Sequence, residues 1–225
     1  MTSASYKPGP HTATLVDELA RLRAGEPVGN ALLDLARAGR LEVEHLRRLV
    51  GVELQCHIAE LTAYGTLIGR FPHRPAAGLF LDVGRLVYDA HPKLRACAFA
   101  LDIPEERFYR WPTGPAAHAF PGLISWTALH GSLADAAFGL YADLTAYFPG
   151  CSELLTQVGA LDLKVPEEFA AYYEGGESEE MNDNTLDVVE HGIVHGDDPA
   201  RALASARTVD EHIGRFWAAA AGSDG

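Results

Sequence analysis

The sequence predicts an all-α fold, because three observations agree. Apolar residues recur at the three- and four-residue spacing of a helix in most long segments. No segment alternates apolar and polar residues over the length of a strand, and no β-hairpin turn joins two such segments. Proline and glycine fall between the periodic stretches, where they end one helix and precede the next.

The first half of the chain is predicted to form four helices. Gly25 and Pro27 end the first of them, and Pro72 stops the third. Pro92 leaves two alternatives for the fourth, one long helix or a broken pair, because proline disfavours a helical conformation in the residue before it. The predicted ranges are Thr12–Ala24, Ala31–Ala38, Glu42–Phe71 and Ala77–Leu101.

The second half begins with a connecting segment, Ile103–Pro115, in which Glu105–Trp111 is a candidate short helix. Further helices are predicted at Ala116–His130, Leu133–Phe148, from Cys151 onward, Pro166–Tyr173, Asn184–His195 and Pro199–Ala221. No change of composition divides the periodic region. We therefore expect a flexible tail over residues 1–11 and a single domain over residues 12–222.

Cys151 is a candidate nucleophile because of its predicted place in a helix. Pro149 and Gly150 are expected to interrupt the preceding helix, which puts Cys151 at the start of a new helical turn. Unpaired N–H groups and the positive end of the helix dipole would lower the pKa of a thiol there and favour the thiolate. The alternative is a buried structural cysteine.

Charge and cysteine content restrict the classes of function. The chain has 31 acidic and 18 basic residues and a formal net charge of -13, which disfavours a nucleic-acid partner or an anionic membrane surface. No apolar stretch is long enough to span a membrane, and Met1–Pro10 lacks the apolar core of a signal peptide, so we expect a cytoplasmic protein. Its three cysteines include no CxxC pair, which indicates neither a disulfide framework nor a thiolate metal site.

Two stripes of acidic and histidine residues are candidate sites. Glu53, His57 and Glu60 share one face of a long predicted helix, where they would supply an acid/base pair or half of a carboxylate-bridged iron site. The alternative is a polar face with the spacing of helical ion pairs. A second stripe, which includes His191 and His195, has the spacing of two metal ligands but lies opposite the apolar side of its helix, so exposure to solvent is expected. An iron-dependent protein would use Glu53 and His57 from the first stripe and His191 from the second, together with the adjacent Glu190.

Aromatic residues could form the walls of a pocket for a flat ligand, although such residues are also ordinary core. The aromatic candidates are Phe120, Trp126, Tyr141, Tyr147, Tyr172, Tyr173 and Trp217. His130, at a helix end, is a candidate base. No role is assigned to five other histidines: His11, His45, His73, His91 and His118. The sequence contains no phosphate loop, dinucleotide fingerprint or serine elbow, which argues against ATP, NAD and serine-hydrolase chemistry.

Several short motifs resemble the TenA/thiaminase II family. The segment from Cys151 to Val158 and Gly159 resembles that family's catalytic-cysteine helix, and Arg215–Ala219 is similar to the end of its last helix. The resemblance covers about Thr12–Ala221. It implies a heme-oxygenase-like helical bundle around a central pocket, hydrolysis of aminopyrimidines through the cysteine, no cofactor and a homo-oligomer.

The same resemblance implies roles for further residues. Phe120 and Trp126 match the segment that places an aromatic ring over the pyrimidine. The aspartate that holds the pyrimidine falls at Gln55 or at Glu53, and neither is Asp. The family's C-terminal glutamate position is Ile213, so the nearby His212 is a candidate replacement base.

Three functions therefore remain open. The first is a TenA-like enzyme acting on a planar nitrogen heterocycle or related metabolite, with Cys151 as nucleophile and Glu53, His57 or His212 transferring protons. The second is a non-heme iron oxidase or oxygenase on the same fold. The third is a protein that binds a small molecule and has lost its catalytic residues.

Overall fold

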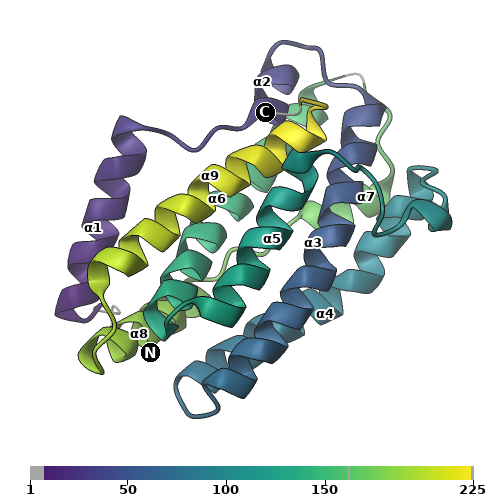
Figure 1. Cartoon of the computed structure of the whole chain (residues 1–225). Coiled ribbons are helices and arrows are strands. Elements are labelled where there is room, and N and C mark those ends of the chain that lie inside the picture. The colour runs from purple at the N-terminus through teal and green to yellow at the C-terminus, as the bar shows by residue number, and fades with distance from the viewer. Residues whose placement is uncertain (1–7, 162, 224–225) are drawn as a thin grey trace, which may run out of the picture.

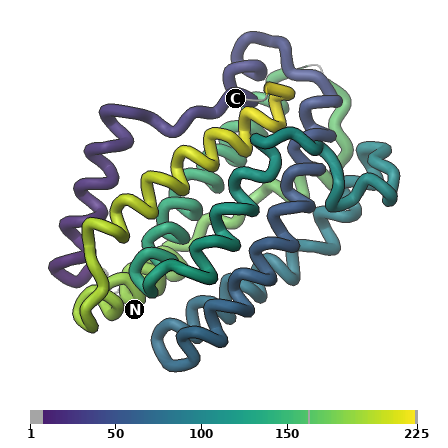
Figure 2. Tube along the Cα trace, viewed as in Figure 1, coloured from purple at the N-terminus to yellow at the C-terminus, as the bar shows by residue number. Residues whose placement is uncertain are grey.

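The computed structural model describes residues 8–161 and 163–223, and over these residues it contains helices and no strand (Figures 1 and 2). The prediction of an all-α fold is confirmed. In chain order the elements are α1 (Pro10–Gly25), α2 (Ala31–Arg37), α3 (Val43–Arg70), α4 (Ala76–Ala100), the short 3₁₀ helix η1 (Glu105–Arg107), α5 (Pro115–His130), α6 (Leu133–Ala160), α7 (Glu167–Tyr173), α8 (Glu179–Val194) and α9 (Pro199–Ala220). The predicted tail lies mostly outside the described residues, and α1 begins at Pro10 within it.

The helices pack as a bundle in which α6 and α9 are central. Helix α6 packs against α8 and α9, while α3 packs against α4 and α5, and α5 joins the two groups by packing against α9. Figure 1 shows α1 at one side of this bundle and α4 at the other. The short helix α7 lies against α4 and α6. The largest fully buried side chains include Trp217 from α9, Phe138 from α6 and Phe80 from α4.

Helix α6 corrects the prediction of a break at Pro149 and Gly150. It runs without interruption from Leu133 to Ala160, so Cys151 lies inside a helix and not at its start. Packing explains the continuity. A Cβ atom at Gly150 would lie 3.0 Å from the Cζ2 atom of Trp217, so this glycine permits the close approach of α9. Tertiary contacts outweigh the local cost of an internal proline here.

Helix α4 is likewise continuous through Pro92, which selects the one-helix alternative. The candidate short helix before α5 is smaller than predicted and covers only Glu105–Arg107. Helix α8 begins at Glu179, earlier than predicted, because the Ser178 side chain accepts a hydrogen bond from the Met181 backbone N–H and caps the helix.

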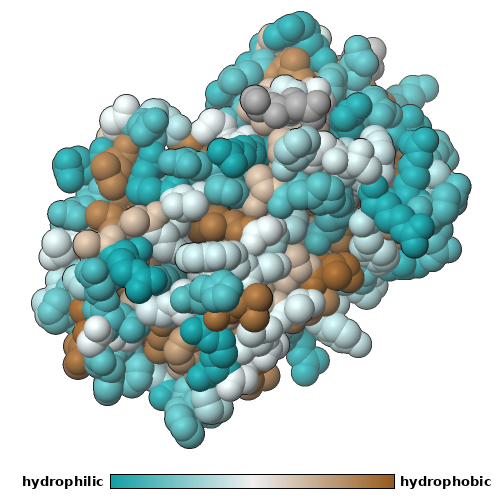
Figure 3. Space-filling model, in the orientation of Figure 1, coloured by the Kyte–Doolittle hydropathy of each residue, from teal (hydrophilic) through white to brown (hydrophobic). Residues whose placement is uncertain are grey.

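The face shown in Figure 3 is mostly hydrophilic, with separate apolar patches between the helices. The exposed large apolar side chains include Trp126 and Leu129 on α5. Within the described part of the chain, no helix combines the length and the apolar character needed to cross a membrane.

A buried ion-pair network connects α1, α6 and α9. The Asp210 carboxylate, which is 2% exposed, accepts hydrogen bonds from Arg23 Nη2 at 2.7 Å and from Arg207 Nη1 at 2.9 Å. Arg23 also donates to the Ala142 carbonyl at 2.8 Å and to the Thr145 hydroxyl at 2.9 Å. One acidic side chain is therefore held by two guanidinium groups, and one of these reaches the neighbouring helix.

We expect Asp210→Ala to lower the free energy of unfolding by about 3 kcal/mol, because two arginines would lose a buried partner. Chemical denaturation would measure the change. Glu26→Ala is the matched control, since Glu26 also pairs with Arg207 but its side chain is 88% exposed, and its loss should cost less than about 1 kcal/mol. Equal effects of the two substitutions would contradict the structural role of Asp210.

Candidate functional site

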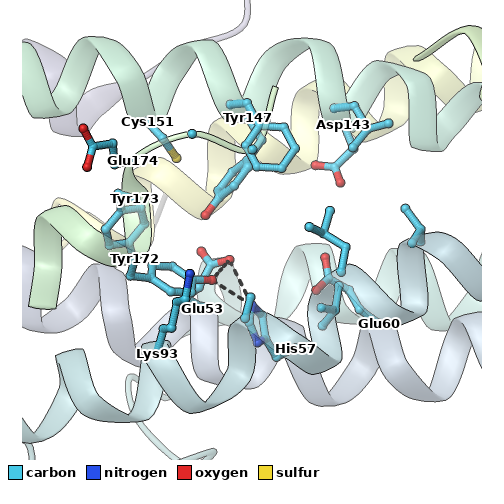
Figure 4. A pocket seen from close by; sticks show the side chains of 18 of the residues that line it. Glu53, His57, Glu60, Lys93, Asp143, Tyr147, Cys151, Tyr172, Tyr173 and Glu174 are labelled. Carbon is cyan, nitrogen blue, oxygen red and sulfur yellow. Dashed lines mark hydrogen bonds and ion pairs between the residues drawn. The ribbon is translucent and has the colours of Figure 1, made fainter. Parts of the chain in front are cut away.

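A cavity of about 210 Å³ lies between α3, α4, α6 and α7 (Figure 4). Figure 4 shows side chains of α6 on one side of it and side chains of α3 on the other. The polar and aromatic residues that line it include Glu53, His57, Glu60 and Tyr64 from α3, Lys93 from α4, Asp143, Tyr147 and Cys151 from α6, and Tyr172 and Tyr173 from α7. This cavity is the candidate site.

Two helical stripes bring these groups together. Glu53, His57 and Glu60 follow at intervals of four and three residues, so one face of α3 presents all of them to the cavity. Asp143 and Cys151 are separated by two four-residue steps along α6 and lie on a common face in the same way. The stripe on α3 is therefore a pocket wall and not a solvated face.

A tyrosine hydroxyl bridges the acid and the histidine of α3. The Tyr172 hydroxyl donates a hydrogen bond to Glu53 Oε1 at 3.3 Å and lies 2.7 Å from His57 Nε2. His57 Nε2 lies 3.8 Å from the same carboxyl oxygen. The other oxygen, Glu53 Oε2, is buried and has no hydrogen-bond partner among the described residues. Glu53 therefore keeps an acceptor available at the pocket.

Burial sets the protonation of the acids. It raises the pKa of Glu53 to about 8 and that of Asp143 to about 7, and the Tyr147 hydroxyl only partly opposes this for Glu53. Burial, together with the charges of Asp143 and Glu53, raises the pKa of Glu60 well above its usual value. No lysine or arginine of the described residues forms an ion pair with these three carboxyl groups. Near neutral pH, Glu53 is therefore mostly protonated in the resting pocket, and Asp143 is about half protonated.

His57 is neutral in the same environment. Burial and, to a smaller extent, the neighbouring His91 lower its pKa to about 3. His57 Nδ1 lies 3.3 Å from His91 Nδ1. The histidine is therefore a neutral hydrogen-bonding group in the pocket wall.

The structure places Cys151 at the pocket but corrects the reason given for its reactivity. Burial raises the pKa of its thiol well above the usual value, and the charge of Glu53 raises it further, while the Tyr147 hydroxyl lowers it by less. The thiol is 1% exposed and lies inside α6, so no free helix N-terminus acts on it. The resting group is a thiol and not a thiolate.

Five predicted site residues lie outside this cavity. Gln55 is buried on α3 but donates to the Pro112 carbonyl at 3.0 Å, and His212 Nδ1 lies 2.8 Å from the Thr208 carbonyl within α9. Phe120 lines a neighbouring, mostly apolar cavity that shares Tyr64, Leu140 and Asp143 with the candidate site. Trp126 is 58% exposed, and His130 lies against its ring at the surface. These positions do not support the roles predicted for them.

The four residues predicted as iron ligands are not brought together either. Glu190 lies at the contact between α8 and α1, where it accepts hydrogen bonds from the Thr12 hydroxyl at 2.6 Å and pairs with His11 at 2.8 Å. His191 on α8 packs beside His195, which follows the end of that helix, and neither residue lines the pocket. Over residues 8–161 and 163–223, no group of three or more His, Cys, Asp or Glu side chains is placed to hold a metal ion. The predicted ligand set therefore does not fit an iron site.

Sequence reasoning missed Asp143 as a site residue. Its signal was an acid within an otherwise apolar helical face, four residues before Tyr147 and eight before Cys151. Lys93 gave no comparable signal, because its approach to the pocket depends on how α4 packs against α3 and α7.

Comparisons with known proteins support this architecture. No protein-family model and no curated protein sequence matches the chain. The crystal structure of a TenA homologue from Pseudomonas syringae pv. tomato is similar, with a TM-score of 0.75 and 13% identity over 98% of this chain and 95% of that chain. A TenA homologue from Pyrococcus furiosus gives a TM-score of 0.69 and 14% identity over 93% of this chain and 99% of that chain. The chain therefore has the fold of the TenA homologues.

Proposed function

We propose that this protein is an enzyme that binds a positively charged planar nitrogen heterocycle and cleaves a carbon–nitrogen bond with the help of Cys151. One observation carries the proposal. Three carboxyl groups, Glu53, Glu60 and Asp143, face one cavity together with a thiol, and no described arginine or lysine forms an ion pair with them. Such a cavity favours a ligand that brings its own positive charge and N–H donors.

The walls of the cavity favour a flat ligand. Tyr147, Tyr172 and Tyr173 line it, and aromatic faces attract cations by their negative electrostatic potential. Its volume of about 210 Å³ is below the roughly 300–1,000 Å³ of pockets for drug-sized ligands. A single heterocyclic ring with an amino substituent therefore suits the cavity better than a nucleotide.

The chemistry follows from the charge of such a ligand. A bound cation stabilises carboxylate and thiolate, so it lowers the pKa of both Glu53 and Cys151. The Glu53 carboxylate can then accept the thiol proton as the sulfur attacks a ring carbon, and the same carboxyl can return that proton to the departing amine. Water replaces the sulfur in a second step, which regenerates the thiol. The net reaction exchanges a carbon–nitrogen bond for a carbon–oxygen bond.

Affinity for a permanently charged ligand should rise with pH. Carboxyl groups with a raised pKa are neutral at pH 6 and ionised at pH 9, so a cation gains partners as the pH passes about 7 for Asp143 and about 8 for Glu53. For an N-methylated 4-aminopyrimidinium ion we expect at least a roughly tenfold tighter Kd at pH 9 than at pH 6. Isothermal titration calorimetry would measure it.

Three controls test this origin of the pH dependence. Glu53→Gln should remove the increase in affinity near pH 8 and leave the increase in affinity near pH 7. Glu174→Gln removes an exposed carboxyl group at the same cavity and should leave both increases in affinity unchanged. A neutral aniline of the same shape should bind with little change across this range. An affinity for the cation that does not depend on pH, or tighter binding of the aniline at pH 9, would contradict the proposed ligand class.

Cys151→Ser should reduce turnover at least about 100-fold while changing the Kd less than about threefold, because a hydroxyl is a far weaker nucleophile than a thiol of similar size. The assay follows release of ammonia from a panel of 4-aminopyrimidines. Cys97→Ala is the control, since Cys97 is buried outside the pocket lining and should retain turnover.

The outcomes separate the rival functions. Full turnover by Cys151→Ser would remove the cysteine mechanism. Tight binding of the cation by the unmodified protein, without release of amine from any member of the panel, would instead support a protein that binds its ligand and does not convert it.

A further inference from the structure

A continuous line of hydrogen-bonding side chains leads from the pocket to the surface. It starts at Glu53 and Tyr172 and continues from Tyr172 to His57 Nε2 at 2.7 Å. From there it runs from His57 Nδ1 to His91 Nδ1 at 3.3 Å and from His91 Nε2 to the Tyr109 hydroxyl at 3.1 Å. The line crosses from α3 and α7 to α4 and then to the segment between η1 and α5.

Exposure increases along this line. Glu53 is 5% exposed and His57 is 3% exposed, His91 is half-buried, and Tyr109 is 37% exposed at the outer end. The line therefore connects a buried carboxyl group with solvent by a route other than the pocket itself.

The groups at the two ends of the line determine which atom donates in each of its hydrogen bonds. At the outer end, Arg95 can only donate. It donates from Nη1 to the Tyr109 hydroxyl at 3.2 Å, and Glu105 holds its Nη2 at 2.7 Å. At the inner end, an ionised Glu53 can only accept. Each intervening group then donates inward, which assigns the proton of His57 to Nε2 and that of His91 to Nδ1.

The backbone of Tyr109, at the outer end of the line, adopts an unfavourable conformation. Tyr109 has φ +63°, a left-handed conformation that is unfavourable for a tyrosine by about 1 kcal/mol or more. Its ring stacks on His91 with centroids 6.0 Å apart and meets Phe108 edge-on. These contacts keep the hydroxyl of Tyr109 within reach of His91 despite the strain.

We propose that the line formed by Tyr172, His57, His91 and Tyr109 carries protons between Glu53 and solvent, so that Glu53 can change its protonation state while a ligand fills the pocket. This deepens the proposed function, which requires Glu53 to lose its proton when a cation binds and to regain one for the next cycle.

Each transfer along the line balances. When Glu53 takes a proton, Tyr172 gives up its hydroxyl proton and takes the Nε2 proton of His57. His57 then receives the Nδ1 proton of His91 at its own Nδ1, and His91 receives at Nε2 a proton from Tyr109, which is replaced by one from water. One proton moves from solvent to the carboxylate, and no bond between heavy atoms changes. The reverse sequence releases a proton. Burial lowers the pKa of both histidines, so neither retains the proton that it passes on.

Infrared spectroscopy tests the path without any substrate. The protein at pH 6 is mixed rapidly with D₂O, and the shift of the carboxylic acid C=O band reports the exchange of the Glu53 proton. The difference from Glu53→Gln assigns that band. We expect His91→Gln, which keeps a polar side chain but cannot relay a proton, to slow the exchange at least about tenfold. Tyr109→Phe should slow it less, because His91 itself reaches solvent in part.

His130→Gln is the matched control, since His130 lies at the surface beside Trp126 and should leave the rate unchanged. Circular dichroism and thermal unfolding would establish that each variant is folded, and Tyr109→Phe, which keeps the ring, provides the test if His91→Gln does not fold. Exchange as fast in both folded variants as in the unmodified protein would overturn the path and show that protons enter through the pocket mouth.

A second readout separates this proposal from the proposed reaction. If the protein turns over a substrate, His91→Gln should lower kcat about tenfold or more with little change in KM, and added imidazole should restore part of the rate. If the protein converts no substrate but proton exchange is slow in the variants, the proton path is supported and only the proposed reaction is contradicted. An unchanged kcat in His91→Gln would overturn the role of the path in turnover.

Discussion

The fold buries three carboxyl groups against one cavity without giving them positively charged partners from the described chain. Asp210 provides a contrast, because that buried acid is held by Arg23 and Arg207. A structural acid is thus paired in this molecule, whereas the acids of the cavity have no such partner and burial raises their pKa. A positive charge in the cavity must therefore come from a bound ligand. The protonation of the acids, the preference for a cationic ligand and the protonation of the Cys151 thiol all follow from this lack of a positive partner.

Much of the fold was predictable from the sequence because apolar periodicity is a local property. The long helices α3 and α9 lie almost where the spacing of their apolar residues places them. The prediction of a helix break at Pro149 was wrong for a physical reason. Whether an internal proline ends a helix depends on the contacts that the continued helix makes, and the packing of Gly150 against Trp217 is visible only in three dimensions.

The site was predictable where one helix face decided it and not where several elements converge. Glu53 and His57 were found because their spacing on α3 fixes a common side, and Tyr147 and Cys151 share the face of α6 in the same way. Gln55 lies only two residues from Glu53, yet that step turns its side chain toward the Pro112 carbonyl. His91 was assigned no role because its contact with His57 joins helices far apart in the sequence.

The placement of Cys151 inside α6 changes what activates it. A thiol at a helix start would be acidic at all times, whereas this thiol is held in its protonated form by burial and by the nearby Glu53. On the proposed mechanism, the ligand's own charge makes both groups more acidic, so the nucleophile forms only when something is present to attack. The same coupling requires a proton to leave the occupied pocket, and the line from Tyr172 through His57 and His91 to Tyr109 offers an exit that the ligand does not block.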